Sequence, residues 1–248
     1  NCRGILMSEW KPKRFWKKVD VVSLEKGFCI KLDAKILKTP AKKEMLLPTN
    51  ALAKKIAAEW DRQVDEIDPN AMPFTKSANA ALDKVIEQFE EVNSLVGDYG
   101  DTDLLYYRAD SPAELKIRQE SSWDPIIDWA EKNFEVKINC GTGILYIPQE
   151  RELIYKLSKE ISELSSFQLT ALYDIVSITG SLILGLATIN GRLSAEDAFN
   201  LSRIDELWQI EQWGVDEEAQ AVSDLKYDVI MHAQEFFILS SGNKSTIF

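Results

Sequence analysis

The sequence LSRIDELWQIEQWG, residues 201–214, predicts a helix with two unlike faces. At about 100° per residue, one arc is apolar and typical of a core-facing stripe. It holds Leu201, Ile204, Leu207 and Trp208. The opposite arc holds Glu206, Gln209, Ile210 and Trp213. A tryptophan outside the core stripe, beside a carboxylate and an amide, is either covered by another part of the chain or free to meet a partner. The stretch therefore predicts a core contact and a candidate binding surface on one helix.

Helical patterns dominate the chain on both sides of this stretch. Ser194, followed by two acids, predicts the N-terminus of the helix that continues through residues 201–214. Thr49 or Asn50 can cap a helix that carries Leu52, Ile56 and Trp60. Further helices are expected over residues 77–97, 111–134, 149–163, 167–190 and 216–240. The exception is residues 136–147, which read as a strand pair or an extended crossing around two glycines, with a return to the N-terminal strands as one alternative.

The N-terminal part reads as strands. Residues 14–48 contain short alternating or β-branched runs separated by turn signals, which favours a small antiparallel sheet or barrel-like unit. About 35 residues can bury only a small hydrophobic core, so we expect this unit to pack against another part of the protein. We therefore expect an α+β fold, with a β-rich domain over residues 1–70 and a larger, mostly α-helical domain over residues 71–248.

Composition excludes several classes of protein. The chain has 248 residues, with 45% hydrophobic and 28% charged residues, which is typical of a soluble globular protein. Its net charge is −11, so neither a nucleic acid nor an anionic membrane is expected as a partner. The basic cluster Lys11, Lys13, Arg14, Lys17 and Lys18 is interpreted as a solvated segment. The longest apolar run, residues 175–189, is interrupted by hydroxyl side chains and shorter than the ~20 residues of a membrane span.

The sequence lacks the usual signatures of metal and nucleotide sites. Three widely spaced cysteines and one histidine, His232, offer no zinc cluster and favour a reducing compartment. No phosphate-binding loop, dinucleotide fingerprint or nucleophile elbow is present. No metal and no cofactor are therefore expected. With no presequence or signal peptide in view, and Met7 read as the natural start, we expect the bacterial cytoplasm, with the mitochondrial matrix as the alternative.

Nine segments, in order, resemble one protein family. They are KRFW (13–16), GFCIKLDAKILKTPAK (27–42), AAEWDRQ (57–63), IDPNAMP (67–73), DLLYYRA (103–109), WDPIIDWA (123–130), SLILGLA (181–187), GRLSAEDA (191–198) and SRIDELWQIEQWGVDEEA (202–219). The family is that of the assembly chaperones of F-type ATP synthase that hold the α subunit of the catalytic head, in mitochondria and related bacteria. The resemblance covers about residues 11–240 and departs at Tyr106, where a small residue such as cysteine is expected.

The resemblance implies a non-enzymatic chaperone that binds the unassembled α subunit and shields the surface that later meets the β subunit. Glu206 matches the acidic position of the family's motif, and we expect it to contact the client, although a pair with Arg203 is the alternative. Gln209 and Trp213 would add an amide and an aromatic anchor, unless the final helix buries Trp213. Arg108 is expected either in an interdomain ion pair or at the client contact.

Two rival functions stay open from the residues alone. The first is an enzyme that uses a carboxylate such as Glu206 as a base in a cleft between the domains. The second is an adaptor that docks a partner helix on the small residues Ser177, Ser181 and Gly185, which lie four residues apart. Burial of that row inside the helical domain would exclude the adaptor.

Overall fold

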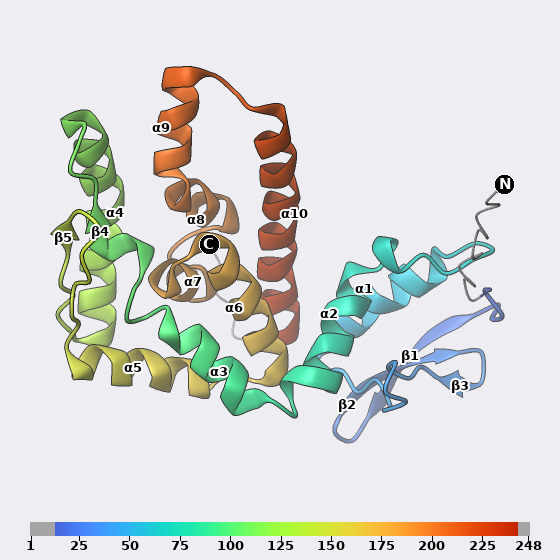
Figure 1. The fold of residues 1–248 in the computed structure, drawn as a ribbon. Helices are drawn as coiled ribbons and strands as arrows, with labels where there is room; N and C mark the ends of the chain where they lie inside the picture. The colour runs from blue at the N-terminus through green and yellow to red at the C-terminus, as the bar shows by residue number, and fades with distance from the viewer. Residues whose placement is uncertain (1–12, 243–248) are drawn as a thin grey trace, which may run out of the picture.

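The structure is a computed structural model that describes residues 13–242. The expected start at Met7 and Lys11 of the basic cluster lie outside the described residues. The elements, in chain order, are β1 (Val19–Leu24), β2 (Gly27–Leu32), β3 (Lys35–Ile36), α1 (Asn50–Asp61), η1 (Pro69–Ala71), α2 (Pro73–Ala80), η2 (Ala81–Val85), α3 (Phe89–Asp98), η3 (Leu104–Tyr106), β4 (Tyr107–Arg108), α4 (Ala113–Phe134), β5 (Gly141–Thr142), α5 (Arg151–Ser162), α6 (Ser166–Thr179), α7 (Leu182–Ile189), α8 (Ala195–Ser202), α9 (Ile204–Trp213) and α10 (Glu217–Ser240). A small sheet near the N-terminus and a larger helical part confirm the α+β fold (Figure 1).

The N-terminal sheet has three antiparallel strands in the order β1-β2-β3. Val21 lies opposite Ile30, so the apolar residues of both strands point to one face, which helix α1 covers. Gly27 turns the chain between β1 and β2 with φ 147°, and a Cβ there would lie 2.6 Å from the carbonyl oxygen of Leu47. Only glycine fits this turn, since any side chain would strike the backbone of the next segment.

The apolar cluster around the sheet is shared with the helical part. Thr49 caps α1 by accepting from the backbone N–H of Leu52 at 3.1 Å, as the sequence predicts. The buried cluster includes Ala81 at the start of η2, Phe167 from α6 and Phe236 from α10. The sheet thus packs against α6 and α10 of the helical part, and the domain boundary expected at residue 70 stays a prediction.

Helices α6 and α7 form the centre of the helical part. Both are predominantly apolar, and α10 packs along α6. The sequence predicts one helix over residues 167–190, and this is wrong. Gly180 ends α6 in the left-handed conformation at φ 67°, and Ser181 then caps α7 by accepting from the backbone N–H of Leu184 at 3.0 Å.

This break also removes the proposed docking row. Ser181 and Gly185 are buried inside the helical part, and a Cβ on Gly185 would lie 2.6 Å from Cγ2 of Val176. Gly185 therefore serves the close packing of α7 on α6, and Ser177 lies on a different helix from the other two small residues. Ser177 itself is exposed, but with Ser181 and Gly185 buried no row of small residues is left at the surface for a partner helix, which excludes the adaptor hypothesis.

Two other expected segments differ from the prediction. The helix over residues 77–97 is divided into α2, the π-helical turn η2 and α3. In η2, the N–H of Ile86 donates to the carbonyl of Ala81, and Asp83 accepts from the hydroxyl of Thr39 at 2.6 Å.

Within residues 136–147, only β5 is a strand. It pairs in parallel with β4 in a two-stranded sheet and does not return to the N-terminal sheet.

Candidate functional site

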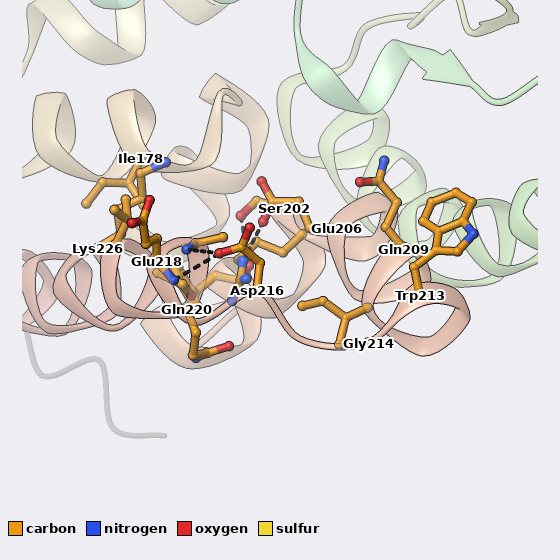
Figure 2. A pocket seen from close by; sticks show the side chains of 16 residues that line it. Ile178, Ser202, Glu206, Gln209, Trp213, Gly214, Asp216, Glu218, Gln220 and Lys226 are labelled. Atoms are coloured by element: carbon orange, nitrogen blue, oxygen red, sulfur yellow. Dashed lines mark hydrogen bonds and ion pairs between the residues drawn. The ribbon is translucent and has the colours of Figure 1, made fainter.

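An open groove of about 700 Å³ lies between α9 and the first turns of α10 (Figure 2). The two helices rise as separate arms joined by a short connection (Figure 1). Apolar and polar side chains line the groove together. They come from α6 (Ile178), α8 (Phe199), α9 (Glu206, Gln209 and Trp213) and α10 (Val222 and Lys226), among others.

The direction of α9 is set by a break at Arg203. The sequence predicts an unbroken helix over residues 201–214, but Arg203 leaves the helical conformation at φ −115° and ψ 19°. The carbonyl of Leu201 accepts a hydrogen bond from the indole Nε1 of Trp123 on α4 at 2.8 Å. In a continuous helix that carbonyl would accept from the N–H of Asp205. The contact with α4 therefore competes with the helix and turns α9 into a new direction.

Helix α9 is fastened to α4 and not to α10. Arg118 of α4 forms two hydrogen bonds with the carboxylate of Glu211, at 2.7 and 2.9 Å, and its guanidinium lies 5.0 Å from the ring of Trp208. The hydrogen bond from Arg118 lowers the pKa of Glu211. Gln119 adds a hydrogen bond to Asp205 at 2.5 Å. These contacts hold the far side of α9, so its Glu206 side is left to face the groove.

The other wall begins with a glycine and a capped helix start. Gly214 ends α9 with φ 90° and ψ 174°, a conformation that L side chains rarely adopt. Asp216 then caps α10 by accepting from the N–H groups of Glu218 at 2.9 Å and Ala219 at 3.1 Å. The connection between the arms is thus short and locally defined, while the arms themselves stay apart.

Three of the predicted site residues meet in this groove: Glu206, Gln209 and Trp213 (Figure 2). The side chain of Trp213 is 79% exposed, so the alternative that the final helix buries it is wrong. Glu206 is 58% exposed and pairs with Arg203 at 2.5 Å, as the alternative from the sequence anticipates. The pair engages Oε2 of Glu206, and Oε1 accepts no hydrogen bond from residues 13–242.

Arg108 lies elsewhere. Its side chain is 5% exposed, pairs with Asp124 at 2.7 Å and stacks on Trp123 at 5.0 Å. Asp124 and Trp123 belong to α4, so the ion pair lies within the helical part and does not join the two domains. These contacts enclose Arg108, so it does not belong to the candidate contact surface in the groove.

Comparison with known proteins places the chain in a family. The family model described as "ATP12 chaperone protein" matches residues 13–131. The protein named "Protein atp12, mitochondrial" from Schizosaccharomyces pombe is 29% identical over 230 residues, which are 86% of this chain and 78% of that protein. The crystal structure of Atp12 from Paracoccus denitrificans is 46% identical with a TM-score of 0.91, over 94% of this chain and 100% of that one. The chain belongs to the Atp12 chaperone family. The Atu1473 protein of Agrobacterium tumefaciens, at 37% identity and a TM-score of 0.85 over 92% of this chain and 86% of that one, shares the fold.

Membership of the Atp12 family makes this protein a chaperone of ATP synthase assembly, as its motifs indicate. The family model ends within α4, whereas the structural match covers nearly the whole chain. The similarity of this chain to the solved structures therefore extends to the part of the chain that holds α9 and α10. The structure of the P. denitrificans Atp12p with a point substitution matches equally well, with a TM-score of 0.92.

Some groove residues of this Atp12-family chain are not predicted from its sequence. Lys226 supplies a cation and Val222 an apolar side chain to the α10 wall of the groove. The acids after Gly214 carry a local signal for Asp216, since an aspartate before a helical run is a common cap. No local signal marks Lys226 or Val222, because their place in the groove depends on how α10 is positioned relative to α9.

The carboxylates with the most altered acidity lie outside the groove. Burial raises the pKa of Asp103 to about 6, although its oxygens accept from the N–H groups of Leu105 and Ile183. Burial also raises the pKa of Asp174 to about 6. Within residues 13–242, no group of three or more His, Cys, Asp or Glu side chains is placed to hold a metal ion. No helix of the same residues is long and apolar enough to cross a bilayer.

Proposed function

We propose that this Atp12-family chaperone binds the unassembled α subunit of F-type ATP synthase in the groove between α9 and α10. One observation carries the proposal: Trp213, a large aromatic side chain, stands 79% exposed beside Glu206 and Gln209 at the rim of an open groove. Large exposed aromatic residues at the edge of a concave surface are typical anchors of protein contacts.

The chemistry of the groove suits a client that must later be released. Trp213 and Ile210 offer apolar area, while Gln209 can bond a backbone amide and the free Oε1 of Glu206 can accept from a basic side chain. A mixed surface of this kind resembles a transient interface more than a permanent one, which is larger and more apolar. Binding at the surface that later meets the β subunit would also keep the isolated α subunit from aggregating.

A non-enzymatic role is supported over the enzyme alternative. The matching family model and the A. tumefaciens relative are described as chaperones, and Glu206, the carboxylate suggested as a base, is paired with Arg203. The two carboxylates whose pKa is raised to about 6, Asp103 and Asp174, do not line the groove.

Co-purification with the cognate α subunit tests the proposal. The tagged chaperone is expected to retain the α subunit, but not the β subunit, and to keep the α subunit soluble during refolding from denaturant. Mutation of Trp213 to serine is expected to weaken retention by at least about tenfold, since removal of an interface anchor typically costs 2 kcal/mol or more. If the unmodified chaperone neither retains the α subunit nor reduces its light scattering, the proposal fails.

We further propose that the protein works in the bacterial cytoplasm. Its identity to the P. denitrificans and A. tumefaciens proteins, 46% and 37%, exceeds the 29% to the mitochondrial protein of S. pombe. Detection of the native protein in a mitochondrial fraction would contradict this.

A further inference from the structure

Residues 139–149 form a loop that is closed at its base by reciprocal hydrogen bonds. The side-chain oxygen of Gln149 accepts from the N–H of Asn139 at 3.0 Å, and its amide nitrogen donates to the carbonyl of Asn139 at 2.8 Å. The side chain of Asn139 donates in turn to the carbonyl of Pro148 at 2.9 Å. Two polar side chains thus hold the two ends of the loop together.

The body of the loop is fastened on both sides of its tip. On one side, β5 pairs with β4, and the N–H of Gly143 donates to the carbonyl of Arg108 at 2.9 Å. On the other side, the hydroxyl of Tyr146 donates to the carboxylate of Asp101 at 2.9 Å. Ile147 turns inward against Gly141, where an added Cβ would lie 2.9 Å from its Cδ1. The backbone that carries the tip is therefore fixed in position before any partner arrives.

At the tip, two adjacent aliphatic side chains point into solvent. Ile144 is 98% exposed and Leu145 is 82% exposed. Single exposed apolar residues are ordinary on a protein surface. Two large neighbours at the tip of a loop held by this many hydrogen bonds are unusual, because the loop keeps them from turning inward. Neither joins an apolar cluster of the described residues.

We propose that this loop is a second docking site for the client, in which Ile144 and Leu145 insert into an apolar pocket of the α subunit bordered by basic side chains. The inference rests on the proposed function but uses a surface separate from the groove, since none of residues 139–149 lines it. The basic border follows from charge. Asp101 lies beside Tyr146 and Asp110 beside Gly143, and neither carboxylate forms an ion pair within residues 13–242.

The same charges argue against an anionic membrane as the occupant. A bilayer that carries negative headgroups attracts basic segments, whereas the tip is flanked by two acids on a chain of net charge −11. A protein pocket with a cationic rim is complementary to both features of the loop, because its apolar interior suits the tip and its rim suits the two acids. Because the loop is already ordered, little conformational freedom is lost on insertion, which favours affinity.

The double variant Ile144→Ser/Leu145→Ser tests the inference. Burying one aliphatic side chain of this size corresponds to about a 10- to 100-fold gain in affinity. The dissociation constant for the cognate α subunit is therefore expected to rise at least about 100-fold for the pair. The melting temperature is expected to stay unchanged, because neither side chain is packed. Val64→Ser is the matched control: Val64 is 76% exposed but lies between α1 and α2, so the variant should bind like the parent protein.

The arms of this experiment separate the possible failures. If the parent protein does not bind the α subunit, the proposed function and this inference both fall. If the parent binds and the double variant binds equally well, only the inference is overturned. Asp110→Lys should weaken binding and reduce its dependence on salt. An unchanged salt dependence would overturn the basic border. Binding of the parent, but not the double variant, to vesicles with anionic lipid would overturn the assignment to a protein pocket.

Discussion

Reversal of charge at Glu206 separates a contact residue from a structural one. In the variant Glu206→Lys, the ion pair with Arg203 at 2.5 Å is lost and replaced by two neighbouring cations. The pair joins residues three apart on the chain, and Glu206 is 58% exposed. Exposed pairs of this kind stabilise a protein by about 0.2–1 kcal/mol, and like charges destabilise it by a similar amount.

The expected effect on the fold is therefore small. A loss of about 1 kcal/mol lowers the melting temperature of a chain of this size by about 2–4 °C. The expected effect on binding is much larger if Glu206 meets a basic side chain of the α subunit. Removal of one partner of a desolvated charge pair costs about 2–5 kcal/mol, or about 30- to 4,000-fold in the dissociation constant. The variant should thus remain folded and lose the client.

The assay is a titration of labelled α subunit with each purified chaperone, alongside a thermal melt. Glu152→Lys provides a matched control, because Glu152 is an exposed, ion-paired glutamate on α5, with Lys156 at 3.0 Å. The control should show a similarly small change in melting temperature and normal binding. Normal binding by Glu206→Lys would remove Glu206 from the contact surface. A fall in melting temperature well beyond 4 °C would refute the view that Glu206 is structurally unimportant.

Three further outcomes follow from the packing and the charges. Gly185→Val should lower the free energy of unfolding by about 1–3 kcal/mol, seen as a lower urea midpoint, because its Cβ would lie 2.6 Å from Val176; an unchanged midpoint would show that α7 can shift. Burial raises the pKa of Asp103 from 3.8 to about 6, so the folded state holds this proton more tightly. The stability that protonated Asp103 contributes is complete below pH 4 and is lost as the pH rises through about 6. The free energy of unfolding is expected to fall by about 3 kcal/mol over this range. Urea titrations across this range should show the loss in the parent protein and not in Asp103→Asn; parallel curves would contradict the shift. Arg118→Ala should speed hydrogen exchange throughout α9, because Glu211 loses its partner, while exchange in α6 stays slow; equal protection in both proteins would mean that other contacts hold α9.

Local patterns predict most of the elements but not where helices break. The alternation in residues 14–48 predicts the N-terminal strands, and Thr49 and Ser194 mark helix starts that the structure confirms. Gly180 did carry a visible stop signal, followed by a capping serine. The apolar pattern nevertheless continues through Gly180 and favours a single helix, because nearly all of α7 is buried and α6 is predominantly apolar.

The break at Arg203 has no local signal. No glycine or proline stands there, and the apolar spacing runs through it. The cause is Trp123, which lies 78 residues earlier in the chain and whose indole N–H donates a hydrogen bond to the carbonyl of Leu201. For the same reason, Glu206, Gln209 and Trp213 could be named as a group from the helix pattern, whereas the opposite wall of the groove could not. The residues of that wall are brought to the groove by the position of α10 relative to α9, which depends on tertiary contacts.

Because α9 is held by hydrogen bonds to α4, the width of the groove between α9 and α10 depends on α4, a helix that does not line the groove. The connection between α9 and α10 spans only residues 214–216, but the arms are spaced by Arg118 and Gln119, which do not line the groove. A change in α4 can therefore widen or narrow the opening without altering any surface that a client touches. The residues of α4 that set the width of the groove and the residues of α9 and α10 that would contact the client thus belong to different stretches of the chain. Each set can vary while the other is kept.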